Sequence, residues 1–136
     1  MIYKIDEETA RADLERLADM MDIDLTLDPD MDAKEQKDSQ KSIDTVVKAI
    51  RKGDLVITDE GEAVFTPARS KGVDPITFRE PTGATLLAAD KYSDNQKMHK
   101  MYAMVAEMTG TPNATFGKLK KSDMNVVMAV GIIFLG

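Results

Sequence analysis

Cysteine does not occur among the 136 residues of this chain, and histidine occurs once, at His99. The chain therefore forms no disulfide, has no thiol for catalysis or metal binding, and cannot build a site that needs two imidazoles. Tryptophan is absent as well, and aromatic residues make up only 5% of the sequence. Ten methionines supply apolar bulk in their place, an unusually high number for this length.

Long apolar runs are also missing. The longest run, residues 126–136, is too short to cross a bilayer, because a membrane-spanning helix needs about 20 apolar residues. The first residues, MIYKIDEETAR, lack the basic and then apolar order of a secretory signal peptide. We therefore expect a soluble cytoplasmic protein that does not associate with membranes.

Positive charge is scarce in the first half of the chain, and the net charge of −6 is unevenly divided. Residues 1–68 hold 18 acidic and nine basic side chains, a net charge of −9. Residues 69–136 hold six acidic and nine basic side chains, a net charge of +3. Nucleic-acid binding depends on clustered positive charge. We therefore expect no nucleic-acid partner, and two differently solvated surfaces are the simplest account of the asymmetry.

Apolar periodicity and turn residues predict an α+β fold. The expected elements are helices over 6–22, 32–52, 83–92, 95–109 and 122–135, a β-hairpin over 55–66 and a third strand over 76–80. Thr82 and Asp94 are predicted to be the N-caps of the two helices that follow them. We expect a small three-stranded antiparallel sheet with helices packed on it, and helical N- and C-terminal parts.

Two sections of the chain are expected to differ in character. Residues 1–67 are predicted to form an acidic helical segment plus the β-hairpin. Residues 68–136 are predicted to form a strand followed by a three-helix region, and to make one compact unit with the hairpin.

Three candidate chemical motifs each lack a feature that their chemistry requires. Residues 110–118, GTPNATFGK, have too many residues between the glycines for a phosphate-binding loop. Residues 24–35 place acidic or hydroxyl side chains at calcium-loop positions, but Pro29 stands where that loop needs a glycine. His99 lies between Lys97 and Lys100, with no carboxylate beside it in sequence to make a general base. We therefore expect no enzymatic activity, no metal and no cofactor.

The methionines and the apolar C-terminal residues are the stronger functional signal. Helical spacing places four methionines near one face of the helix over 95–109, and two more follow on the last helix. Such residues pack a core or form an adaptable binding surface, because methionine is unbranched and polarizable. The residues predicted to bind a partner are Met98, Met101, Met104, Val105, Met108, Met124, Met128, Ile132, Phe134 and Leu135.

Ile76–Pro81 read ITFREP, and the chain continues to residue 136 with a predicted helix, a T-G pair and an apolar last helix. In this order the motifs of residues 75–136 resemble those of bacteriophage tail assembly chaperones, a family that carries an I-T-L-R-E/K-P strand at the first position. A helix and then a T-G, short loop, D unit follow, at Thr109, Gly110 and Asp123. The family ends in an apolar helix that closes near G-x-x-x-F-L. Gly131, Phe134 and Leu135 are the candidates here, with one residue fewer between the glycine and the phenylalanine.

The resemblance implies a non-catalytic protein that binds the tape measure protein during tail assembly, with the tail tube protein as a second candidate partner. It further implies that the protein acts in the cytoplasm of the infected bacterial host and is not part of the mature virion. We also expect the protein to self-associate when its partner is absent, since a soluble monomer rarely leaves a contiguous apolar patch uncovered. The role of residues 1–67 is not covered by the resemblance.

Two other classes of function stay open: a small structural virion protein of the tail or head-completion type, and a small regulatory binding protein. The sequence also permits a longer product. Ile133–Leu135 and Leu119–Lys121 can be encoded by heptamers on which ribosomes shift frame. The apolar pattern of the last helix stops abruptly, so this helix must be packed in the core, docked on a partner or continued in a longer product. We therefore hypothesise that a minor longer form exists.

Overall fold

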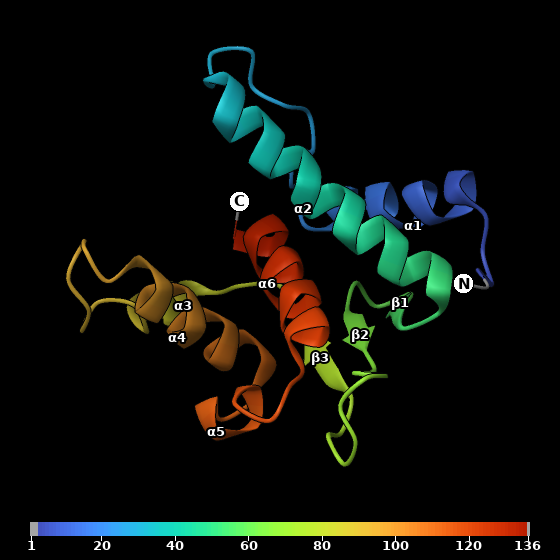
Figure 1. The fold of residues 1–136 in the computed structure, drawn as a ribbon. Helices are drawn as coiled ribbons and strands as arrows, with labels where there is room; N and C mark the ends of the chain where they lie inside the picture. Colours follow the sequence, from blue (N-terminus) through green and yellow to red (C-terminus); the bar gives the residue numbers. More distant parts are fainter. Residues whose placement is uncertain (1–2, 136) are drawn as a thin grey trace.

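The computed structural model describes residues 3–135, which form six helices and three strands (Figure 1). The predicted α+β fold is confirmed, with a three-stranded antiparallel sheet and helices at both ends of the chain. The helices are α1 (Glu7–Met20), α2 (Ala33–Lys52), α3 (Gly83–Leu87), α4 (Lys97–Thr109), α5 (Asn113–Phe116) and α6 (Lys121–Leu135). The strands are β1 (Leu55–Ile57), β2 (Ala63–Phe65) and β3 (Ile76–Phe78).

The sheet has the strand order β1-β2-β3, and Val64 of β2 lies between Val56 and Thr77 of its neighbours. Gly61, in the predicted turn between β1 and β2, has a φ of 85°, a conformation that glycine adopts without strain. Side chains alternate across the strands, so one face of the sheet packs into the core and the other faces solvent. The core-facing residues are Leu55, Ile57, Ala63, Phe65, Ile76 and Phe78.

The first two helices begin and end at local signals in the sequence. The Asp6 carboxylate accepts the Thr9 N–H at 2.7 Å and caps α1, and Asp32 caps α2 in the same way through Glu35. Gly53 ends α2 in a left-handed conformation with a φ of 81°. Both helices bury an apolar stripe against each other and against β1. The predicted ranges for these two helices are therefore close to the observed ones.

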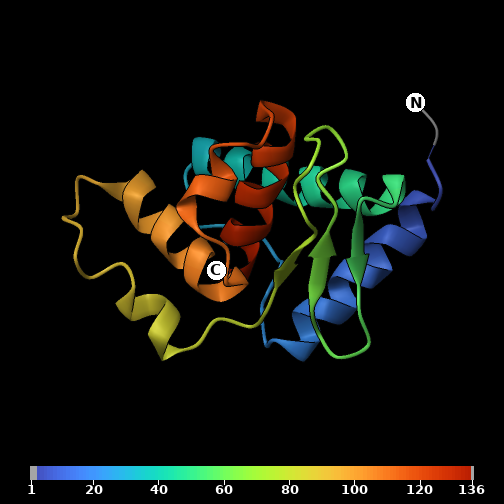
Figure 2. The same ribbon diagram turned by 90° about the horizontal axis from the view of Figure 1, so that it is seen from below.

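Helix α6 lies in the middle of the molecule, between α2 on one side and α4 on the other (Figures 1 and 2). Its residue Phe134 meets Phe78 of β3 edge to face, with 5.9 Å between the ring centres. One continuous hydrophobic core, from Ala10 to Phe134, includes side chains from the three strands and from every helix except α3. The acidic first half and the basic second half of the chain therefore share this core.

The segment between α3 and α4 differs from the sequence prediction. Helix α3 ends at Leu87, and α4 begins only at Lys97, with Gln96 as its N-cap residue. The prediction that Asp94 caps this helix is wrong. The Ser93 N–H donates to the Gln96 side chain at 3.0 Å, and Asp94 accepts a hydrogen bond from Lys100 at 2.9 Å, so the chain turns here before the helix begins.

Helix α5 was not expected from the sequence. It is a single turn that follows Pro112, whose fixed φ suits the residue before a helix. Gly110 ends α4 with a φ of 64°, in agreement with the predicted end of this helix at residue 109, and α5 places Phe116 in the core. Residues of this turn also line a surface hollow between α4, α5 and α6.

Candidate partner-binding site

The methionine stripe of α4 divides by burial along the helix. Met98, near the N-terminal end, is 54% exposed, and Met101 and Met104 are half-buried. Met108, near the C-terminal end, is 4% exposed, and Val105 is fully buried. The stripe is therefore both surface and core: it can contact a partner near Met98 and fills the interior near Met108.

The predicted contact residues on α6 divide in a similar way. Ile132 is 44% exposed, whereas Met124, Met128 and Leu135 are half-buried and Phe134 is buried in the core. An apolar helix of this kind, covered on most sides, is typical of the centre of a domain. Of these five residues, Ile132 is the one that presents a large apolar surface to solvent.

Three of the ten predicted contact residues therefore belong to the core in this conformation, namely Val105, Met108 and Phe134. They can hold α4 and α6 in place but cannot touch a partner without a rearrangement. The role of the exposed and half-buried residues stays a prediction.

Close packing of α4 on α6 depends on Gly131. A Cβ atom at this position would lie 2.7 Å from the Val105 Cγ2 atom and 3.8 Å from the Met101 sulfur. The first distance is shorter than real Cβ contacts, so a larger residue would force the Val105 side chain, or α4 with it, to shift. Gly131 thus explains why the part of α4 around Val105 is buried.

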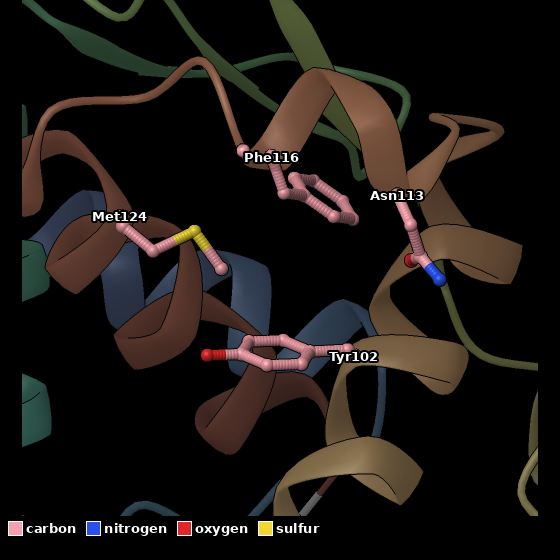
Figure 3. Close-up of a pocket in the computed structure, with 5 residues that line it drawn as sticks. Tyr102, Asn113, Phe116 and Met124 are labelled. Carbon is pink, nitrogen blue, oxygen red and sulfur yellow. The ribbon is translucent and has the colours of Figure 1, made fainter.

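A hollow of about 290 Å³ lies where α4, α5 and α6 meet (Figure 3). The Phe116 ring and the Met124 methyl group point into it from different sides, and the Tyr102 ring and the Asn113 side chain also line it. Of these four residues only Met124 was predicted from the sequence. The other three were missed because α5 was not expected and Tyr102 lies beside the methionine stripe.

The largest exposed apolar side chains near the stripe come from α3. Leu86 is 60% exposed and Leu87 is 67% exposed. Leu87 lines a second hollow, of about 350 Å³, together with Tyr92 and with Ala103 and Ala106 of α4. In both ribbon views α3, α4 and their connecting loop project away from the sheet (Figures 1 and 2).

The sequence missed these leucines because the expected helix over 83–92 would have been long enough to bury one face. The observed α3 has about one and a half turns and buries only Thr85. Ala89, just after the helix, is also buried. Thr85 ties α3 to α4: its hydroxyl donates to a Glu107 carboxylate oxygen at 2.8 Å and accepts the Thr82 N–H at 3.1 Å. Helix α3 is therefore held by polar contacts while its leucines face outward.

Asp123 holds the start of α6 against the loop that precedes β3. Its Oδ2 atom accepts the Ser70 hydroxyl at 2.6 Å and the Arg69 N–H at 3.0 Å. Ser70 Oγ in turn accepts the Lys120 N–H at 2.8 Å. Asp123 and Ser70 are both buried, so this network fixes two segments that are far apart in sequence.

Residues 24–35, rejected as a calcium loop, use their carboxylates locally. Asp24 accepts the Thr26 N–H at 2.8 Å, and Asp28 accepts the Asp30 N–H at 2.9 Å. The first of these bonds holds the pKa of Asp24 below its ordinary value, since it favours the charged carboxylate. Within residues 3–135 no cluster of three or more histidine, cysteine or acidic side chains is placed to bind a metal ion.

His99 stacks on Tyr92, with 5.5 Å between ring centres and 20° between ring planes. Both side chains belong to the α3–α4 region. In the part of the chain that the structure describes, no helix has the length and apolar character needed to cross a bilayer. What the site offers chemically is apolar and aromatic contact surface, with charged side chains around it.

Comparisons of the chain with protein families, with curated proteins and with solved structures gave no match. Function is therefore inferred from the residues and the geometry.

Proposed function

We propose that this protein is a non-catalytic tail assembly chaperone of a bacteriophage, and that it binds the tape measure protein during tail assembly. The observation that carries the proposal is the exposure of Leu86, Leu87 and Met98 on α3 and α4. All three lie in the section whose sequence resembles that family. Leu87 also lines the hollow of about 350 Å³ beside α4, and an apolar groove on the surface suits the capture of a helical partner.

A tape measure protein is long and helical and carries apolar stripes, so a protein that holds it must accept many similar but unequal surfaces. Methionine and leucine side chains meet that need, because they repack around different shapes at small cost. Met98 and the half-buried Met104 provide such side chains on α4. The strongly acidic first half of the chain would keep the complex dispersed.

Two residues at positions of the family motif have structural roles that would support this surface. Asp123 fixes the start of α6, and Gly131 allows α4 to pack closely on α6. Both positions hold the helices that carry the proposed contacts. On this proposal the protein acts in the cytoplasm of the infected bacterium, and the tail tube protein is a second candidate partner.

The proposal is tested by co-expressing the chain with the tape measure protein encoded in the same genome. We expect the tape measure protein to stay in solution and to co-purify with the chain, whereas alone it should aggregate through its apolar stripes. Equal aggregation with and without the chain would contradict the proposal. Purified phage particles should lack the chain, and its presence there would favour a structural virion protein.

A further inference from the structure

Five basic side chains gather at one end of α6. Two come from the segment that joins α5 to α6, one is the first residue of α6, and two come from the loop that the Asp123 network holds beside it. All five are exposed, and within residues 3–135 none of them forms an ion pair. This basic rim consists of Arg69, Lys71, Lys118, Lys120 and Lys121.

The basic rim borders the hollow between α4, α5 and α6. Phe116 and Gly117 line the hollow just before the three lysines in sequence, and Met124 lines it just after them. Apolar walls next to unpaired cations favour a ligand that has apolar side chains flanked by carboxylates. The hollow, at about 290 Å³, has room for aliphatic side chains.

The same chain carries a segment of this chemistry. Residues 22–32, DIDLTLDPDMD, hold five aspartates, and no lysine or arginine occurs between Arg16 and Lys34. Within this acidic segment Ile23 and Leu25 pack against the core. Leu27 and Met31 are half-buried and line a shallow hollow of about 140 Å³, so part of each side chain remains accessible.

The acidic segment cannot reach the basic rim of its own molecule. It lies at the C-terminal end of α6, where Ile132 and Ile133 share a hollow with Leu27 and Met31. The basic rim lies at the N-terminal end, at Lys121. A helix of 15 residues is about 22 Å long, and Figure 1 shows the two regions at opposite ends of the molecule.

We propose that the acidic segment of one copy binds the basic rim and the adjoining hollow of a second copy. Leu27 and Met31 enter the hollow, and Asp28 and Asp30 face the lysines of the rim. The two surfaces differ, so the contact is head to tail. A pair of copies therefore leaves one basic rim unused on the first copy and one acidic segment unused on the second, until the assembly closes or grows. A second copy is the occupant because the charges are complementary: residues 22–32 carry five aspartates and no cation, and the rim carries five cations.

Charge-reversed variants of the full chain test this contact by sedimentation velocity. The variants are Lys118→Glu with Lys120→Glu, and Asp28→Lys with Asp30→Lys. We expect the wild-type chain to associate at low salt and to dissociate as salt screens the charges. Each variant alone should be monomeric. An equimolar mixture of the two should form dimers, because each variant keeps the surface that the other has lost.

Lys91→Glu with Lys97→Glu is the matched control for the lysine variant. It changes the net charge by the same amount, at two exposed lysines that are not part of the rim. It should associate as the wild-type chain does. Thermal unfolding checks each variant, and neutral replacements by glutamine and asparagine stand in for any variant that fails to fold. A wild-type chain that stays monomeric at low salt, or a mixture that stays monomeric, would overturn the proposal and leave the rim to another partner.

Discussion

Replacing Asp123 with alanine is expected to lower the free energy of unfolding by about 3 kcal/mol, since hydrogen bonds to a buried charged group are strong and their loss leaves polar groups unpaired. The Ser70 hydroxyl and the Arg69 N–H both lose their acceptor. Ser70 in turn is less well placed to accept the Lys120 N–H. Urea unfolding followed by circular dichroism measures the effect.

Two further variants show whether the hydrogen bonds are the cause. Asp123→Asn should lose clearly less stability, because both bonds go to Oδ2 and an amide oxygen can accept both. Asp74→Ala, in the exposed part of the same loop, should leave stability nearly unchanged. If Asp123→Ala unfolds at the same urea concentration as Asp74→Ala, the network does not hold the start of α6.

Replacing Phe134 with alanine is expected to cost about 4 kcal/mol of folding stability, which is the usual loss for a buried phenylalanine. Phe134 is 5% exposed and packs edge to face on Phe78, which is itself fully buried. The truncation leaves a cavity between α6 and β3, and the surrounding helices cannot close it. Thermal or urea unfolding should show a large and cooperative loss.

Ile132→Ala, two positions earlier on the same helix, should cost much less, because Ile132 is 44% exposed. Comparing the Phe134→Ala and Ile132→Ala variants distinguishes core from surface positions in a segment whose residues are all apolar. Equal losses for the two variants would mean that α6 is covered on the Ile132 side as well.

The sequence contained enough local information for most of the fold. Asp6, Asp32 and Gly53 mark helix ends through their own backbone and side-chain bonding, and the turn at Gly61 requires a conformation that glycine favours. Such features act over a few residues, so they are readable from the chain alone. The prediction for the segment around Asp94 failed because the Asp94 carboxylate accepts a hydrogen bond from the Lys100 side chain rather than from the helix backbone, and α4 begins after Gln96 without a side-chain cap.

The candidate site was less predictable because it depends on contacts between distant segments. Periodicity places Met98 and Met108 near one face of a helix, but the approach of α6 at Gly131 decides which of them is buried. The same holds for Ser70 and Asp123, whose hydrogen bond joins residues 53 positions apart. A single sequence carries no signal for pairs of that kind.

The central claim, that exposed apolar side chains of α3 and α4 bind a helical partner, is tested most directly by titration calorimetry. Wild-type chain, a Leu87→Glu with Met98→Glu variant, and a Val56→Glu control are titrated with purified helical segments of the tape measure protein. Leu87, Met98 and Val56 are all more than half exposed, so all three chains should fold. Val56 lies on the solvent face of β1, away from α3 and α4.

We predict that the wild-type chain and the Val56 control bind equally well. The double variant should bind at least about tenfold more weakly, a loss of about 1.4 kcal/mol or more, because two charges would be placed in an apolar contact. Equal binding by all three proteins, or no binding by the wild-type chain, would contradict the claim.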